Sequence, residues 1–210
     1  SIGQTYPGFM LCIFIPVFFY SFGINSWFMN PITSPIGLAG ITANAAAFEQ
    51  GLQPTNIYTS NVTFSVIFIG GMGMTLALNI MMLKSRSKRI RKFGQIAMIP
   101  SLFNINEPLV HGAPIALNPI LMIPMWINAL VLPTIAWFAF SSGLVTIPHA
   151  VMNVNQLPMP ICSFLATHGD FRAVILVVGM FLLSWLIWWP FFKAHENKMV
   201  KEEMEMEAND

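Results

Sequence analysis

Long apolar segments with few polar interruptions dominate the pattern of the chain. A helix that crosses the hydrocarbon core of a bilayer needs about 20 mostly apolar residues. Three segments meet this requirement, and they are Gly8–Phe28, Val62–Leu83 and Ala173–Phe192. A fourth span is predicted within Pro119–Phe140. In the second segment Gly70, Gly71 and Gly73 predict a small-residue face for close packing of helices.

The other apolar stretches are broken by Pro, Gly and Asn residues. They are Ile32–Phe48, Ile96–Leu117 and Leu144–Leu165. Each proline removes a backbone donor and frees a carbonyl, so these stretches are not expected to form straight lipid-facing helices. In hydrocarbon the freed groups must be buried in protein or line a wet cavity, as in re-entrant hairpins. The pattern therefore predicts an all-α membrane protein. About four transmembrane helices are expected, with re-entrant hairpins that flank the fourth span and form a substrate site near the midplane.

The placement of the few charged residues strengthens the membrane prediction. Of the 210 residues 55% are apolar and 9% are charged, whereas a soluble domain carries about 25% charged residues. Residues 1–83 hold a single Asp, Glu, Lys or Arg, which is Glu49, and residues 93–169 hold only Glu107. A soluble fold of this size would need charges over its whole surface, so the pattern excludes that class.

One basic cluster, residues 84–92, holds six Lys and Arg residues directly after an apolar span. Such a cluster is typical of a cytoplasmic loop at the membrane edge, and no nucleic-acid partner is expected. The same rule places the loop at residues 50–60 outside, and it places Ser1 and the tail in the cytoplasm. The chain then divides into a membrane-embedded transport domain, residues 1–192, and a charged cytoplasmic tail, residues 193–210.

The segment Ser101–Gly112 carries the most distinctive polar residues of the chain: two asparagines, a carboxylate and a histidine. A carboxylate at membrane depth costs at least about 2.5 kcal/mol unless it is paired or faces water, so Glu107 is a functional candidate. Pro108 fits the first turn of a helix, and the peptide N–H groups beyond it could bind a polar ligand together with Glu107. Carboxylate and amide groups suit sugar hydroxyls, because each accepts or shares several hydrogen bonds. The alternative is that Asn106 and Glu107 only cap a helix.

Two motifs resemble the sugar-transporting enzyme IIC family, the membrane component of the bacterial phosphoenolpyruvate-dependent phosphotransferase system. The first is Phe103-Asn-Ile-Asn-Glu-Pro-Leu-Val110, followed by Gly112-Ala-Pro-Ile-Ala-Leu-Asn-Pro-Ile-Leu-Met-Ile-Pro124. The second is Pro160-Ile-Cys-Ser-Phe-Leu-Ala-Thr-His-Gly-Asp-Phe-Arg172. Both are similar to the lactose, cellobiose and diacetylchitobiose branch of the family.

The resemblance implies roles for the polar residues of the first motif. Glu107 matches the family's glutamate that hydrogen-bonds the hydroxyl to be phosphorylated, so it is the expected catalytic residue. Asn104, Asn106 and Asn118 are expected to bind the sugar or to brace the loop.

Two positions depart from the family pattern. The family usually carries Gly-Ile-His-Gly where this chain has Gly23-Ile-Asn-Ser26, so Asn25 stands in place of the expected histidine. His111 follows Glu107 by four residues, which is one helical turn. We therefore predict that His111 replaces the lost imidazole as a partner of the sugar or of Glu107, with Asn25 as a further sugar contact.

Several other side chains have predicted roles. Trp27, Trp126 and Trp137 are candidates to stack on a sugar ring, although single tryptophans in membrane helices more often contact lipid or pack. Asp170 and Arg172 are predicted to pair with each other or to face water near a hairpin end.

The resemblance implies a membrane subunit of a sugar phosphotransferase in the bacterial cytoplasmic membrane, with a multi-pass arrangement. Such a subunit binds an external disaccharide of the cellobiose, lactose or chitobiose type and presents it for phosphorylation by subunit IIB. The expected partners are the sugar, subunits IIB and IIA, and the lipid bilayer. No cofactor and no metal are expected. Family members are longer than this chain, so a homodimer is expected through an N-terminal half that is missing here. Two alternatives stay open: a proton-coupled secondary sugar transporter, and an inactive truncated paralogue.

Overall fold

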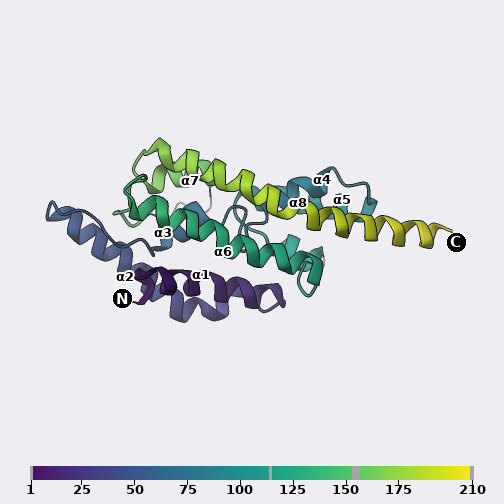
Figure 1. Cartoon of the computed structure of the whole chain (residues 1–210), viewed down its shortest axis with the longest axis horizontal. Coiled ribbons are helices and arrows are strands. Elements are labelled where there is room, and N and C mark those ends of the chain that lie inside the picture. The colour runs from purple at the N-terminus through teal and green to yellow at the C-terminus, as the bar shows by residue number, and fades with distance from the viewer. Residues whose placement is uncertain (1, 114, 153–156, 209–210) are drawn as a thin grey trace.

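The computed structural model describes residues 2–113, 115–152 and 157–208. These residues form helices and turns and contain no strand. The long helices follow one common axis, so the molecule is elongated (Figure 1). In chain order the helical elements are η1 (Ile2–Gln4), α1 (Tyr6–Ser21), η2 (Ser26–Met29), α2 (Asn30–Glu49), α3 (Ser60–Val62), η3 (Thr63–Ile67), α4 (Leu76–Leu83), α5 (Lys88–Leu102), η4 (Pro108–Gly112), α6 (Pro119–Ser141), α7 (Met159–Ala166) and α8 (Phe171–Glu207). The prediction of an all-α fold is confirmed.

The helices α6 and α8 lie side by side and run in opposite directions through the centre of the molecule (Figure 1). They span 23 and 37 residues, and both are long and apolar enough to cross a membrane. Pro119 occupies the first turn of α6, where its missing N–H needs no partner, and the Asn118 side chain accepts a hydrogen bond from the Ile120 N–H. The segments Pro119–Phe140 and Ala173–Phe192 are therefore helical, as predicted. The helix α1 has 16 residues, is shorter, and packs against α6.

The prediction of one continuous helix over Val62–Leu83 is wrong. The chain passes from α3 into the π-helical turn η3, and α4 begins only at Leu76. Between them Gly70, Gly71 and Gly73 have φ angles of 77°, 96° and 90°, which side-chain-bearing residues adopt only with strain. These glycines turn the backbone and interrupt the helix, instead of forming a small-residue face.

The opposite error concerns Ile32–Phe48, which lies within the continuous helix α2. Pro31 lies in the first turn, where its missing donor is harmless, and Pro35 removes one further hydrogen bond near the N-terminus. Both prolines come early, so the rest of the helix keeps its hydrogen bonds. Gly40 lets α2 approach the loop that follows it, because a Cβ there would collide with the Tyr58 carbonyl.

The first predicted span, Gly8–Phe28, ends earlier than expected. The helix α1 stops at Ser21, and Gly23, with a φ of 80°, begins a turn into η2. The Asn25 side chain caps η2 by accepting a hydrogen bond from the Trp27 N–H at 3.0 Å. The chain therefore reverses here and returns along α2 (Figure 1).

The chain is also irregular on both sides of α6, as the prolines predict. Before α6, α5 ends at Leu102 and only the short turn η4 follows. After α6, residues 142–152 contain no helix. The basic cluster, expected as a loop, contributes its second half to α5 instead. There the Ser87 hydroxyl caps the helix by accepting from the Ile90 N–H at 3.1 Å.

The N-terminal residues lie at the end of the molecule opposite to the basic cluster (Figure 1). Gln4 donates a hydrogen bond to the Tyr58 carbonyl at 2.8 Å and accepts one from the Tyr58 N–H at 3.0 Å. It therefore lies beside the loop at residues 50–58. Ser1 is outside the described residues. The helix α1 runs from the end that holds the loop at residues 50–58 towards the other end (Figure 1), and the cytoplasmic placement of Ser1 stays a prediction.

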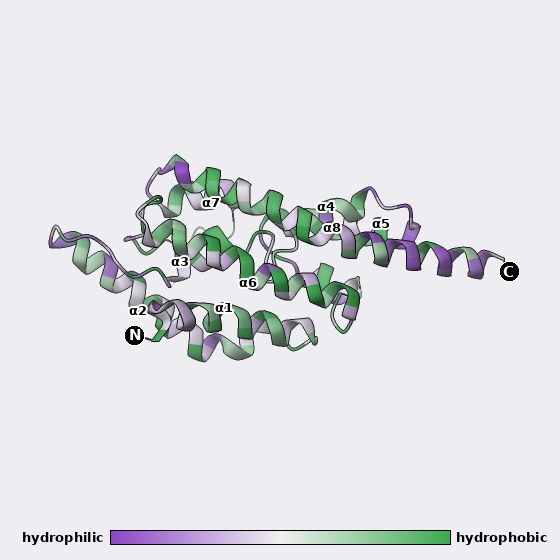
Figure 2. Cartoon of the chain, in the orientation of Figure 1, coloured by the Kyte–Doolittle hydropathy of each residue, from purple (hydrophilic) through white to green (hydrophobic). Residues whose placement is uncertain are grey.

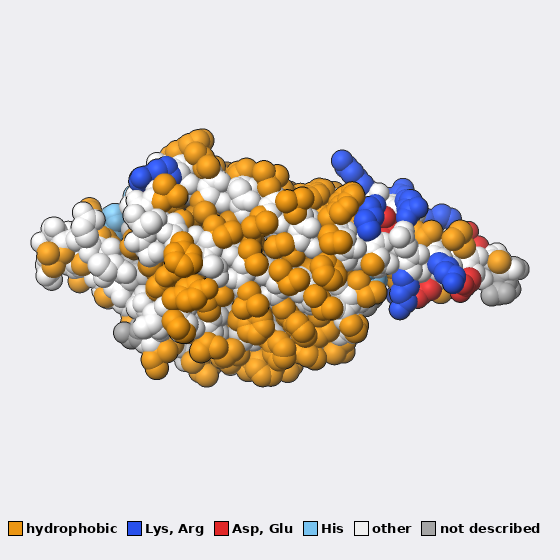
Figure 3. All heavy atoms as spheres, viewed as in Figure 1, with side chains coloured by type: hydrophobic (Ala, Val, Ile, Leu, Met, Phe, Trp, Pro, Cys, Tyr) orange, Lys and Arg blue, Asp and Glu red, His pale blue; other side chains and the backbone are white. Residues whose placement is uncertain are grey.

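Apolar residues cover the middle of the molecule, and charged side chains gather at its ends (Figures 2 and 3). Large exposed side chains follow one another along α8, with Ile175, Leu182 and Leu186 all more than half exposed. Such a surface suits contact with lipid. Asp170 and Arg172 pair at 2.9 Å, as predicted. The helix α8 continues beyond residue 192, and the division of the chain at that position stays a prediction.

Candidate functional site

Glu107 lines a cavity of about 670 Å³. Three parts of the chain form its walls: residues 27–34 in η2 and the start of α2, residues 64–72 of the broken helix, and residues 103–108. Neither residues 64–72 nor residues 103–108 form a continuous helix, and the turns of their backbones leave space for the cavity. A pocket of this size is sufficient for a disaccharide-sized ligand.

Asn104 connects the loop before Glu107 to two other segments. Its backbone has a φ of 62°, a left-handed conformation that asparagine tolerates better than most residues. Its Oδ1 accepts a hydrogen bond from the Gly70 N–H at 3.1 Å, and its Nδ2 donates to the Leu157 carbonyl at 3.1 Å. These contacts brace the loop.

Asn106 is buried and fully engaged by the surrounding protein. Its Oδ1 accepts a hydrogen bond from the Tyr20 hydroxyl at 3.3 Å. Its Nδ2 donates to the Met72 carbonyl at 2.6 Å and to the Thr75 hydroxyl at 3.0 Å. Because both ends of the amide are occupied, the structure supports a bracing role for Asn106 and not direct contact with a ligand.

The Glu107 carboxylate faces the cavity and makes no hydrogen bond or ion pair with the described residues. It does not cap η4, so the interpretation of Glu107 as a structural helix cap is not supported. Pro108 does occupy the first position of η4, as predicted. The N–H groups of Leu109 and Val110, however, both bond to the Asn106 carbonyl, so their expected contact with a ligand is wrong. Glu107 is therefore the group of this loop that is available to a ligand.

The three remaining predicted site residues do not line the cavity. His111 packs edge-to-face on the Tyr20 ring, with 5.6 Å between centroids, and forms no ion pair with Glu107 among the described residues. Asn25 caps η2, as described above, and Asn118 caps α6 and lies 3.2 Å from His195 Nδ1. In this conformation Asn25, Asn118 and His111 support neighbouring elements.

The structure adds cavity residues that the sequence did not single out. Asn30 and Ser34 come from α2, and Phe64 and Phe68 come from the broken helix. Asn30 and Ser34 are four residues apart, which is one turn of a helix. This spacing indicates a common face only when residues 30–34 are known to be helical. Trp27, one of three tryptophan candidates, also lines the cavity.

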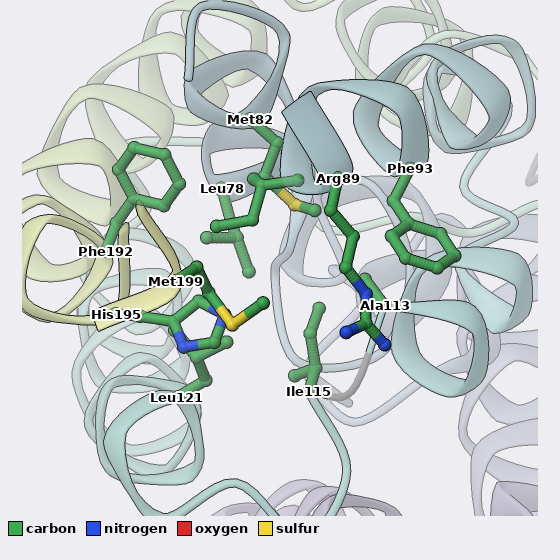
Figure 4. Close-up of a pocket in the computed structure, with 11 residues that line it drawn as sticks. Leu78, Met82, Arg89, Phe93, Ala113, Ile115, Leu121, Phe192, His195 and Met199 are labelled. Carbon is green, nitrogen blue, oxygen red and sulfur yellow. The ribbon is translucent and has the colours of Figure 1, made fainter. Parts of the chain in front are cut away.

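A separate and much smaller cavity of about 20 Å³ lies between α4, α5 and α8 (Figure 4). Its lining is mainly apolar, with Arg89 and His195 as its polar side chains. Burial lowers the pKa of His195, with a further contribution from nearby Lys198. The volume is enough for a water molecule and far too small for a sugar.

Comparison with known proteins shows which family has this sequence and fold. The profile of the family "Phosphotransferase system, EIIC" matches residues 1–129. The chain belongs to the EIIC family of the phosphotransferase system. The resemblance inferred from the two motifs is thereby confirmed, and with it the assignment to the cytoplasmic membrane.

Curated EIIC proteins match along the whole chain. The putative permease IIC component YwbA of Bacillus subtilis (strain 168) is 33% identical over 211 residues, which cover 100% of this chain and 48% of the relative. The cellobiose-specific EIIC component of Geobacillus stearothermophilus is 32% identical and aligns with 96% of this chain and 46% of its own length. The chain thus spans about half the length of the curated relatives it matches.

A solved EIIC structure has the same fold. It is the transporter ChbC, the IIC component from the N,N'-diacetylchitobiose-specific phosphotransferase system. The TM-score is 0.90 at 31% identity, and the match covers 97% of this chain and 48% of ChbC. The fold is therefore that of an EIIC membrane protein. The roles of the six predicted site residues stay predictions.

Proposed function

We propose that this EIIC chain binds a disaccharide within the membrane and holds it for phosphorylation by subunit IIB. Relatives named for cellobiose, for lactose and for N,N'-diacetylchitobiose support a disaccharide of this type. Subunit IIA would supply the phosphoryl group to IIB. A proton-coupled sugar transporter and an inactive paralogue are the alternatives, and no contact among the described residues favours either.

The observation that carries the proposal is the unpaired Glu107 carboxylate in a cavity large enough for the sugar. Glu107 accepts a hydrogen bond from the sugar hydroxyl. As that hydroxyl oxygen attacks the phosphorus of a phosphocysteine on IIB, the S–P bond breaks and an O–P bond forms. Glu107 takes the hydroxyl proton as a general base. The bracing of Asn104 and Asn106 fixes the position of the carboxylate, on which phosphoryl transfer mainly depends.

The arrangement of charges supports a cytoplasmic position for the tail. The basic residue Lys88 pairs with Glu207 at 2.9 Å, so residues 84–92 and the end of α8 lie together. Basic clusters at membrane edges are predominantly cytoplasmic, and we therefore propose that IIB binds at this end of the molecule. We further propose that the protein forms a homodimer, as the resemblance implies.

The substitution Glu107→Gln tests the proposal. The protein is placed in vesicles and supplied with IIA, IIB, phosphoenolpyruvate and labelled cellobiose, lactose or N,N'-diacetylchitobiose. Loss of the base should lower the rate of sugar-phosphate formation by about 10²–10⁴-fold, while the amide keeps the volume of the side chain. The matched control is Glu49→Gln, which changes an exposed acid at the end of α2 and should leave the rate unchanged.

Three outcomes decide between the functions. Phosphorylation that persists in Glu107→Gln contradicts the role of Glu107. Free sugar that accumulates in response to a proton gradient favours a secondary transporter. Absence of sugar binding in the unaltered protein favours an inactive paralogue.

A further inference from the structure

The cavity beside Glu107 continues into a second cavity of about 690 Å³. Six residues line both: Trp27, Asn30, Ser34, Phe64, Phe68 and Met72. The second cavity reaches Cys12 and Tyr58. Tyr58 belongs to the loop at residues 50–58 and bonds to Gln4, so this cavity extends towards the end of the molecule that holds the N-terminal residues. The two form one elongated cleft along α2, with Glu107 at one end of it.

One face of α2 presents unengaged polar side chains to this cleft. Asn30 and Ser34 are four residues apart and therefore lie one helical turn apart. Neither the Asn30 amide nor the Ser34 hydroxyl makes a side-chain hydrogen bond with the described residues. Polar groups at membrane depth are costly without a partner, so a water-filled cleft or a polar ligand is needed to satisfy them.

Trp27 adds an aromatic surface at the same place. Its side chain is 66% exposed and lines both cavities. The other two candidate tryptophans are engaged elsewhere: Trp126 donates to the Ser21 hydroxyl at 2.9 Å, and the Trp137 ring packs 5.0 Å from the Phe9 ring. Of the three candidates, Trp27 is thus the tryptophan that the structure makes available to a ligand in this cleft.

We propose that Trp27, Asn30 and Ser34 form a second sugar-ring subsite. It binds the ring of the glycoside that is not held at Glu107. The indole stacks on the apolar face of the ring, and the amide and the hydroxyl bond to ring hydroxyls. This subsite makes the protein select disaccharides over monosaccharides. The inference rests on the proposed function, because the first ring must occupy the cavity at Glu107.

The turn η2 positions the stacking surface. Asn25 accepts a hydrogen bond from the Trp27 N–H and so fixes the backbone that carries the indole. Asn25 then contributes to sugar binding as a positioning residue, through Trp27, and not as a direct ligand in this conformation.

Equilibrium binding to the purified protein tests the subsite. Cellobiose, lactose and N,N'-diacetylchitobiose are first screened with the unaltered protein. The best binder is then compared with the methyl glycoside of its non-reducing ring, which lacks the second ring. Trp27→Ala should weaken disaccharide binding by about tenfold or more and change binding of the methyl glycoside by less than about twofold. Asn30→Ala and Ser34→Ala should act in the same direction with smaller changes. Trp189→Ala, which removes an exposed tryptophan of α8 outside the cleft, is the matched control and should change neither affinity.

The outcomes separate this inference from the proposed function. Equal weakening of both ligands in Trp27→Ala would assign Trp27 to the first ring and overturn the subsite. Unchanged binding of both ligands would also overturn it, as expected if lipid fills the second cavity. If Glu107→Gln still lowers the rate of sugar-phosphate formation as predicted in either case, the proposed function stands without the subsite. A protein that binds none of the three disaccharides overturns both.

Discussion

Asn106 shows how a single side chain determines the position of the candidate base. Its amide joins the loop before Glu107 to α1 through Tyr20 and to the turn of the broken helix through Met72 and Thr75. These partners lie 31 to 86 residues away along the chain. The position of Glu107 therefore depends on the packing of three separate segments around one amide group.

The near-isosteric substitution Asn106→Asp tests this dependence. It keeps the oxygen that accepts from Tyr20 but replaces the donating Nδ2 by an oxygen that faces the Met72 carbonyl. A buried carbonyl without its donor should lower the free energy of unfolding by about 1–3 kcal/mol, measured as thermal unfolding in detergent. Sugar binding should weaken as the loop loses its brace.

Asn25→Asp is the control for Asn106→Asp. Asn25 uses its side-chain oxygen as an acceptor from the Trp27 N–H, and aspartate retains that oxygen. Its stability should change by less than about 0.5 kcal/mol, as for most exposed positions. Equal stability of the two variants would show that the bonds of Nδ2 in Asn106 contribute nothing to the fold.

The sequence predicts the importance of the segment around Glu107 better than the role of each of its residues. An acid inside a long uncharged stretch indicates function through its desolvation cost alone. Whether Asn104 and Asn106 bind a ligand or brace the loop depends on atoms such as the Met72 carbonyl, which no local pattern indicates. His111 illustrates the same limit, because η4 turns it towards Tyr20 instead of Glu107.

At the scale of elements, the interruption of the helix between η3 and α4 creates the cavity wall. Gly71 has a φ of 96°, and a Cβ there would lie 2.5 Å from Asn106 Cγ. The glycine thus serves two requirements at once, the turn and the close approach of the Asn106 amide. Apolar content alone predicted a continuous helix here, because hydropathy does not distinguish a spanning helix from a broken one.

The pair Gly71→Ala and Gly51→Ala separates these two requirements. Gly51 also has a positive φ, of 72°, but a Cβ there meets nothing within 4 Å. Gly51→Ala should cost only the backbone strain, about 1–2 kcal/mol of unfolding free energy. Gly71→Ala should cost about 1–3 kcal/mol more, because the methyl group also displaces Asn106. Thermal unfolding of both variants measures the difference, and similar losses would mean that the Asn106 contact is easily relieved.

The sequence pattern does not predict the helix α2, for a related reason. Prolines and glycines count against a helix only where they remove hydrogen bonds from its interior. Pro31 and Pro35 lie near the N-terminus, and Gly40 permits the approach of the 57–60 loop to the helix. The broken stretches and α2 have similar compositions, so the distinction depends on tertiary contacts that composition does not contain.

At the scale of the whole molecule, two carboxylates of α8 hold the start of α5. The Glu196 side chain is fully buried and accepts hydrogen bonds from the Ser85 hydroxyl at 2.7 Å and from the Arg86 N–H at 2.8 Å. Lys193 pairs with its second oxygen at 2.8 Å. Residues more than 100 positions apart in the chain are thus joined through one acid.

Glu203, about two helical turns further along α8, makes similar contacts. It accepts from the Ser87 hydroxyl at 2.7 Å and from the N–H groups of Lys88 and Arg89 at 3.1 Å and 3.0 Å. These N–H groups belong to the first turn of α5, where backbone N–H groups have no acceptor within the helix. The residues after 192, expected only as a polar tail, therefore cap the helix that leads to the Glu107 loop.

These contacts predict a loss of stability in acid. Burial alone would raise the pKa of Glu196, but the hydrogen bonds that it accepts lower its pKa below the ordinary value. For Glu203, too, burial raises the pKa. The hydrogen bonds from the Ser87 hydroxyl and from backbone N–H groups together outweigh burial, so the pKa of Glu203 is lowered. A carboxylate with a lowered folded-state pKa contributes stability that is complete above its unfolded pKa, about 4.3 for Glu, and is lost as the pH falls through the folded value.

Glu196→Gln should therefore remove part of the difference in melting temperature between pH 7 and pH 3.5, and it should lower stability at pH 7 by about 1–3 kcal/mol. Thermal unfolding in detergent across this range is the measurement. Glu202→Gln is the control, since Glu202 is partly exposed and lies 3.9 Å from Lys198 on the surface, where such pairs contribute about 0–1 kcal/mol. If the two variants lose equal stability at pH 7, the buried bonds of Glu196 do not hold α5. If Glu196→Gln is destabilised and its sugar binding is weakened as well, the end of α8 maintains the candidate site from a distance, because α5 connects Glu196 to the loop that carries Glu107.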